Sequence, residues 1–158
     1  MPDIGPLVDA VRRKYDDECF ACGRDNPHGM HLDGFALDAN GTVSARFQPR
    51  PEYRGTLGVL HGGIAATALD EVMVWAGILN LGVMSVTGTL DLRYSGTAEV
   101  SDHFTASAWI EEQRGRRLLV AGALTAQGTA KPSVTASGLY LISADVSDLL
   151  ADDTEPRQ

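Results

Sequence analysis

Apolar and polar residues alternate with a period of two along much of the second half of the chain. Between Val86 and Tyr94, apolar residues or glycine take every second position, and polar residues stand between them. This alternation is typical of a strand with one face on a core. Comparable stretches follow at about 103–112, 117–127 and 133–143. The short polar connections between them favour antiparallel hairpins.

The stretch from Val59 to Gly77, VLHGGIAATALDEVMVWAG, has the period of a helix instead. One broad face of this helix collects its apolar side chains, which are Ile64, Ala65, Ala68, Leu69, Val72, Trp75, Ala76 and Leu79. The other side is also mostly apolar. We therefore expect the helix to be buried on two sides, by the sheet and by a second layer such as another copy of the chain.

Weaker signals complete the pattern. Residues 6–15 suit a short amphipathic helix, and 19–29 read as a loop. Two short strands at 32–37 and 42–47 flank the turn sequence DANG. The order predicts an α+β domain with an antiparallel sheet. We divide the chain into an N-terminal helical segment (1–18), one domain (19–146) and a polar tail (147–158).

Composition narrows the possible partners. A chain of 158 residues with net charge -8 is the size of one domain and disfavours nucleic acid and anionic membranes. No basic, continuously apolar leader is evident, and no run approaches the roughly 20 apolar residues that a membrane span needs. Two cysteines are too few for a disulfide framework. We expect a cytoplasmic protein.

Two adjacent acids, Asp70 and Glu71, interrupt the apolar helix. Asp70 points almost directly away from the apolar face, and no lysine or arginine occurs between Arg54 and Arg93. A buried, unpaired carboxylate costs several kcal/mol unless it is hydrogen-bonded or its pKa is raised. Asp70 is therefore either a functional group or an acid that bonds a neighbouring strand at an interface.

The helix begins with His61, Gly62 and Gly63, where free backbone N–H groups can hold an oxyanion. Asp70 lies two to three turns further along, about 10 Å away along the axis. For both to act on one molecule, long side-chain reach or a partner chain is needed.

Together with the following strand, VTGTLDLRY, this helix resembles the hotdog-fold acyl-CoA thioesterases of the PaaI-like branch. The segment CFACGRDNPHGMHL resembles the opening of one subgroup. The resemblance implies a long central helix wrapped by an antiparallel sheet of five or six strands, in a homodimer or homotetramer. It also implies hydrolysis of acyl-CoA to free acid and CoA, without metal or cofactor, since CoA enters with the substrate.

The resemblance also assigns residues. The acid nine positions after His61 is Asp70, which matches the family's nucleophile or general base. The Gly62 amide would stabilise the oxyanion, Thr87 would place the attacking water, and His61 would position the start of the helix. Further candidate substrate contacts, including arginines suited to the phosphates of CoA, are Gly63, Glu71, Arg93, Arg116 and Arg117.

Two other functions stay open. One is a hotdog module that binds acyl-CoA without hydrolysing it, and the other is an acyl-thioester dehydratase or hydratase. The pair Cys19 and Cys22, followed by His28 and His31, is compatible with structural zinc, a redox pair or simple loop packing. Loop packing is the simplest interpretation, and we assign no metal ligands.

Overall fold

The computed structural model describes residues 4–15 and 17–147. Two helices, α1 (Gly5–Lys14) and α2 (Gly62–Leu81), accompany six strands. The strands are β1 (Asp33–Leu37), β2 (Val43–Phe47), β3 (Val83–Tyr94), β4 (Phe104–Arg114), β5 (Arg117–Ala126) and β6 (Val134–Asp145). Two short 3-10 turns, η1 (Pro51–Tyr53) and η2 (Thr56–Gly58), lie in the connection before α2. Of the predicted tail, residues 148–158 lie outside the described part.

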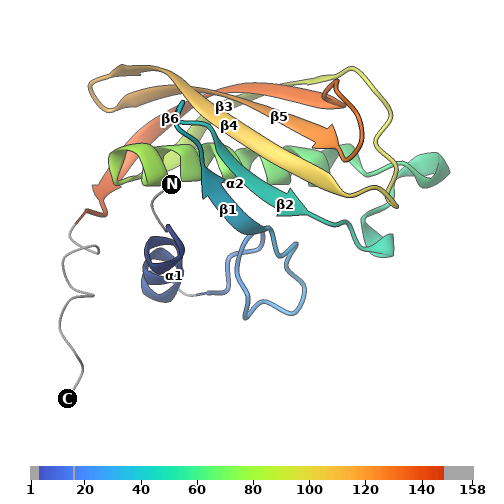
Figure 1. Cartoon of the computed structure of the whole chain (residues 1–158), viewed down its shortest axis with the longest axis horizontal. Coiled ribbons are helices and arrows are strands. Elements are labelled where there is room, and N and C mark those ends of the chain that lie inside the picture. The colour runs from blue at the N-terminus through green and yellow to red at the C-terminus, as the bar shows by residue number, and fades with distance from the viewer. Residues whose placement is uncertain (1–3, 16, 148–158) are drawn as a thin grey trace.

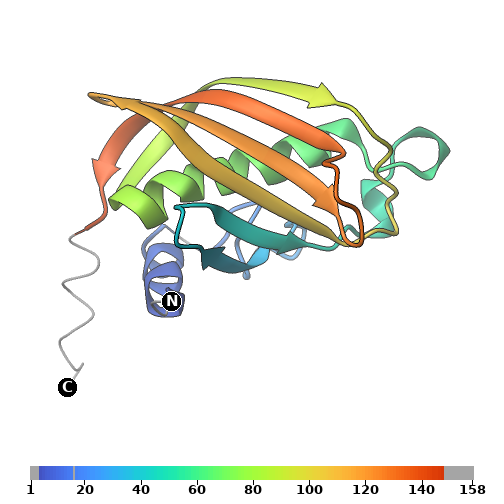
Figure 2. The ribbon, with the colours of Figure 1, turned by 45° about the horizontal axis from the view of Figure 1, so that its top comes forward.

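The predicted α+β arrangement is confirmed. All strand pairs are antiparallel, in the order β1-β2-β4-β5-β6-β3. The sheet curves around α2, which runs along its concave side (Figures 1 and 2). Because β3 is an edge strand, one side of its 12 residues has no strand neighbour among the described residues.

Both ends of α2 are defined by local chemistry. His61 caps the N-terminus through Nδ1, which accepts from the Gly63 N–H at 3.0 Å. Gly82 ends the helix in a left-handed conformation, with φ of 64°, which glycine adopts without strain. Between these caps the apolar face packs on the sheet, and Ala68, Leu69 and Val72 are fully buried.

The length and composition of α2 alone would allow it to cross a membrane, and it is the one such helix in residues 4–15 and 17–147. The expectation that no stretch is apolar enough was therefore wrong. The apolar composition reflects burial within this domain, because the helix packs on the sheet along one side.

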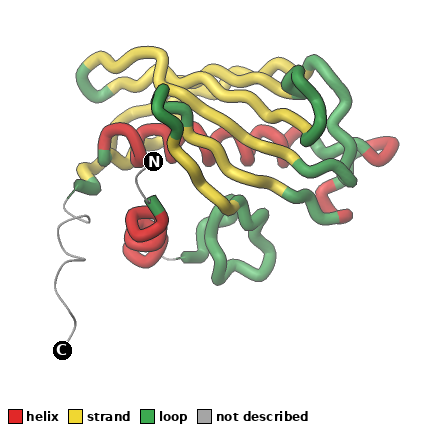
Figure 3. Tube along the Cα trace, in the orientation of Figure 1, coloured by secondary structure: helices red, strands yellow, loops and turns green. Residues whose placement is uncertain are grey.

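The other side of α2 is partly covered by the N-terminal segment. Figure 3 shows α1 and the loop that follows it on the side of the helix away from the sheet. The hydrogen bonds Met30 N–H to Phe20 O and Leu32 N–H to Ala21 O hold this loop together. The result is a second layer over α2, built from the chain itself.

Candidate active site

Asp70 sits at a junction of three elements. It lies on α2, half-buried, and its Oδ1 accepts a hydrogen bond from Thr87 Oγ1 of β3 at 2.8 Å. The same oxygen accepts one from the Tyr140 hydroxyl of β6, also at 2.8 Å. Two donors therefore fix one carboxylate oxygen, and Oδ2 has no donor among the described residues. This arrangement orients the carboxylate and leaves one oxygen available for a substrate or water.

A bulge in β3 brings Thr87 to this position. Thr87 pairs with Tyr140 and Thr89 pairs with Leu139, so Gly88 is an extra residue in the strand. The alternation from Val86 to Tyr94 predicts one continuous half-buried strand, and the bulge corrects that prediction. The extra residue reverses which side chains face the helix. Val86 is 54% exposed as a result, and Thr87 turns toward Asp70.

Tyr140 was not among the site residues predicted from the sequence. Its side chain is fully buried, and burial, followed by the hydrogen bond to Asp70, raises its pKa above that of an ordinary tyrosine. The hydroxyl therefore keeps its proton and remains a donor. The available signal was a hydroxyl-bearing aromatic at an inward position of β6, since a buried tyrosine usually finds a polar partner.

The start of α2 forms a second polar group. His61 occupies the Gly63 N–H, whereas the N–H of Gly62, the first helical residue, has no acceptor within the helix. The Tyr94 hydroxyl donates to the Gly62 carbonyl at 2.7 Å, so the end of β3 closes over this turn. A Cβ at position 62 would lie 3.3 Å from that hydroxyl oxygen. The geometry leaves the Gly62 amide able to bind a carbonyl oxygen.

These two groups are far apart within one chain. Asp70 follows Gly62 by eight residues of continuous helix, which is about 12 Å along the axis. A small group bound at the Gly62 amide therefore lies beyond the reach of the same chain's Asp70. Of the predicted site residues, the structure brings together Asp70 with Thr87, and His61 with Gly63.

The three predicted arginines do not join Asp70. Arg116 donates to the Ile142 carbonyl from Nε and Nη2, at 3.1 and 2.9 Å. Arg117 is exposed at the start of β5, next to the inward-facing Leu118. Arg93 is exposed and precedes Tyr94, whose hydroxyl bonds the start of α2 rather than Asp70. In this chain all three are available to solvent rather than part of the carboxylate site.

Glu71 belongs to a different cluster from its neighbour Asp70. Its Oε1 accepts from Trp75 Nε1 at 2.8 Å, and its Oε2 accepts from Cys19 Sγ at 3.7 Å. Burial raises the pKa of Glu71 to about 7. A hydrogen bond with the Cys22 thiol lowers the pKa of Cys19, and the same bond with burial raises that of Cys22.

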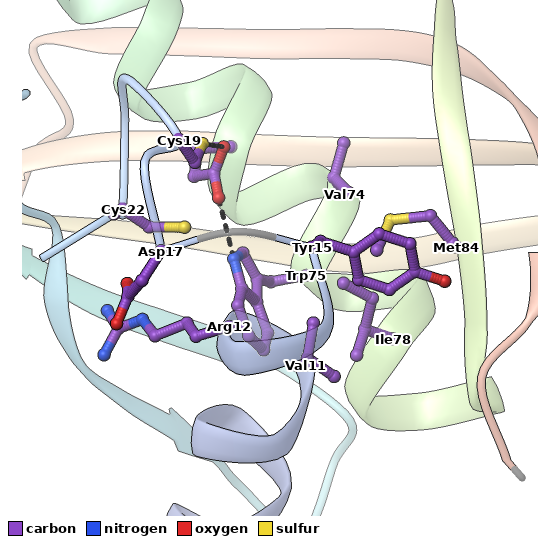
Figure 4. A pocket seen from close by; sticks show the side chains of 12 residues that line it. Val11, Arg12, Tyr15, Asp17, Cys19, Cys22, Val74, Trp75, Ile78 and Met84 are labelled. Carbon is purple, nitrogen blue, oxygen red and sulfur yellow. Dashed lines mark hydrogen bonds between the residues drawn. The ribbon is translucent and has the colours of Figure 1, made fainter. Parts of the chain in front are cut away.

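These side chains line a cavity of about 230 Å³ between the N-terminal segment and α2 (Figure 4). Apolar side chains form most of its wall, namely Val11, Val74, Trp75, Ile78 and Met84. The cavity lies on the face of the helix that carries Glu71. It is thus separate from the hydroxyl partners of Asp70.

Part of this domain matches a known protein family. Residues 57–133 match the model of the thioesterase superfamily. None of the curated protein sequences matches the chain. Among solved structures, protein RHA08564, a thioesterase superfamily protein, is similar with a TM-score of 0.72 and 22% identity. That alignment covers 79% of this chain, which spans 60% of the length of that protein.

Two further structures share the fold. The PaaI protein of E. coli, from its phenylacetic acid degradation operon, has a TM-score of 0.71 and 15% identity, with 89% of this chain and 96% of that one covered. The smu.793 protein of Streptococcus mutans UA159, solved bound to acetyl CoA, has a TM-score of 0.63 and 16% identity, with 72% and 91% covered. The hotdog architecture and the resemblance to this superfamily are confirmed.

Proposed function

On the premise that residues 57–133 carry the thioesterase superfamily match, we propose that this protein hydrolyses acyl-CoA thioesters to free acid and CoA. The observation that carries the proposal is the half-buried Asp70 carboxylate, which two hydroxyls hold through Oδ1. No basic side chain pairs with it among the described residues. The acetyl CoA bound to the similar smu.793 protein supports the choice of ligand.

In the proposed reaction, Oδ2 of Asp70 takes a proton from water as the water oxygen attacks the thioester carbon. The Gly62 N–H stabilises the negative charge that develops on the carbonyl oxygen. The C–S bond then breaks, and the CoA sulfur leaves and takes up a proton. Direct attack by Asp70 on the carbon, followed by hydrolysis of the resulting anhydride, uses the same residues. Thr87 and Tyr140 are positioning residues in either route.

The site requires two copies of the chain in this proposal. Within one chain the Gly62 amide and Asp70 are about 12 Å apart along the helix. The open edge of β3, which carries Thr87, is the natural place for a second copy to pair, since a long unpaired edge invites strand addition. An antiparallel pair of β3 strands would set the two α2 helices alongside each other in opposite directions. The Gly62 amide of one copy would then approach Asp70 of the other.

The test is thiol release from a panel of short, long and aromatic acyl-CoAs. Asp70→Asn keeps the side chain's shape but removes the base, and we expect turnover to fall by about 10²- to 10⁴-fold. Glu111→Gln is the matched control, because Glu111 is exposed on β4, away from both Asp70 and the β3 edge. Equal turnover by wild type and Asp70→Asn would overturn the mechanism.

Two outcomes would favour the other functions. If acyl-CoA binds and is recovered intact across the panel, the protein is a binding module. If an unsaturated acyl-CoA gains or loses water while its thioester survives, it is a hydratase or dehydratase. Mass spectrometry of the recovered CoA species distinguishes these products.

A further inference from the structure

The loop after α1 brings two thiols against a carboxylate of α2. We name Cys19, Cys22 and Glu71 the Cys–Glu cluster. Their ligand atoms, two sulfurs and one carboxylate oxygen, all lie within 4.8 Å of one another. The Cys19 Sγ to Glu71 Oε2 distance is 3.7 Å. Figure 4 shows the two cysteines on one side of the cavity, near the Trp75 indole, whose Nε1 donates to Glu71 Oε1.

We propose that the Cys–Glu cluster binds one divalent transition-metal ion of the zinc type. Two thiolates and a carboxylate are ligands that Zn²⁺ accepts, and a C-x2-C spacing is typical of zinc loops. Three protein ligands leave a fourth tetrahedral position. Because all three residues line the same cavity, water or a small ligand has room to complete the coordination.

The surroundings orient the carboxylate for this role. Trp75 Nε1 donates to Oε1 of Glu71 at 2.8 Å, so Oε2 is the oxygen presented to the thiols. Outer hydrogen bonds of this kind fix the orientation of metal ligands.

The loop is equally constrained on the thiol side. The Gly23 N–H donates to the Cys19 carbonyl at 2.8 Å. A Cβ at Gly23 would lie 2.5 Å from both Asp17 O and Cys19 N, which leaves room for glycine alone. The turn therefore holds both cysteines at one end of the loop.

The one arginine that lines the cavity, within the part of the chain that the structure describes, is not paired with the cluster. Arg12 lines the cavity, but its Nη2 donates to the Leu32 carbonyl at 3.0 Å and its Nη1 pairs with Asp33 at 3.5 Å. Three potential anions, one exposed, one part-buried and one buried, thus meet at the cavity wall, and the guanidinium that lines the cavity is engaged elsewhere. A divalent ion supplies the missing positive charge, and the thiols release their protons when they bind it. No electron transfer is involved.

The proposed ligand set differs from the one suggested by the sequence. The two histidines after the C-x2-C pair lie outside the cluster. His31 contacts the Asn26 carbonyl through Nε2 at 2.7 Å, and His28 is exposed. The third ligand instead comes from Glu71, far along the chain. Such an ion would tie the N-terminal loop to α2 one residue from Asp70.

The test uses Co²⁺ alone, added to the reduced, metal-free full chain without oxygen. We expect one Co²⁺ per chain, with a thiolate-to-cobalt charge-transfer band and the strong visible bands of a tetrahedral ion. Zn²⁺ should displace it and remove both bands. Zn²⁺ should also protect both cysteines from alkylation, a readout that needs no variant. Absence of the charge-transfer band, or unchanged alkylation with Zn²⁺, would overturn the proposal.

Variants identify the ligands. Cys22→Ser should weaken the charge-transfer band, and Trp75→Phe should lower Co²⁺ affinity about 10- to 100-fold by releasing Glu71. Glu71→Gln should lower it at least as far, and Trp75→Phe remains informative if that variant does not fold. His28→Ala and His31→Asn are the controls, with Asn chosen because His31 has φ of 58°. Loss of binding in the histidine variants, with no loss in Glu71→Gln, would refute this ligand set.

Discussion

Removing one oxygen atom, in Tyr140→Phe, tests the hydrogen bonds that hold Asp70. The Tyr140 side chain is 0% exposed, so phenylalanine fills the same space and leaves no cavity around the ring. The change deletes the O–H that donates to Asp70 Oδ1 at 2.8 Å. A hydrogen bond to a charged group contributes about 1.5–3 kcal/mol. Because Thr87 still donates to the same oxygen, we expect a loss near the lower end, about 1.5–2 kcal/mol in the free energy of unfolding.

A double-mutant cycle isolates this contact. In an Asp70→Ala background the Tyr140 hydroxyl is buried without its acceptor, so its removal should cost about 0 kcal/mol or stabilise the protein. The coupling energy between the two positions should then be about 1.5–2 kcal/mol. Urea unfolding followed by tryptophan fluorescence measures all four proteins, at one fixed chain concentration because assembly shifts apparent stability.

The kinetics of Tyr140→Phe test the positioning role of this hydroxyl. If Tyr140 positions Asp70 in the proposed reaction, Tyr140→Phe should lower kcat about tenfold, equivalent to about 1.4 kcal/mol, and leave KM unchanged. A stability cost that is the same with and without the Asp70 carboxylate would show that the two side chains do not interact. A normal kcat beside the expected coupling energy would limit Tyr140 to a structural role.

Two further changes probe the frame of the site. Gly138→Ala should destabilise the protein by about 1–3 kcal/mol and lower turnover by shifting Tyr140, since the added Cβ would lie 2.7 Å from Thr89 O and 2.8 Å from the Tyr140 ring. Urea unfolding and thiol release measure the two effects, with Ser137→Ala, at an exposed position, as the control. Wild-type stability of Gly138→Ala would contradict the packing argument. His61→Ala should lower the free energy of unfolding by about 1 kcal/mol through loss of the helix cap, as measured by urea unfolding. A fall in kcat as large as that of Asp70→Asn would instead show that His61 takes part in proton transfer.

The sequence alone predicted the elements and their order, because their signals are local. The period of the stretch ending at Gly77 predicts α2, and the alternations after it predict β3 to β6. Local turn chemistry likewise predicted the DANG turn between β1 and β2. Asp70 stood out for a similar reason, since an acid among apolar helical residues is visible without knowledge of its partners.

Only the tertiary structure decided what surrounds the two acids. Tyr140 meets Asp70 from 70 positions away, and Cys19 meets Glu71 from 52 positions away. Gly88 moves Thr87 to the helix side through a bulge that pairing with β6 defines. The period of a strand shows that its side chains alternate, but not where an extra residue reverses the alternation. That choice depends on the register between strands and on how the sheet packs over α2, both of which arise from contacts between distant parts of the chain.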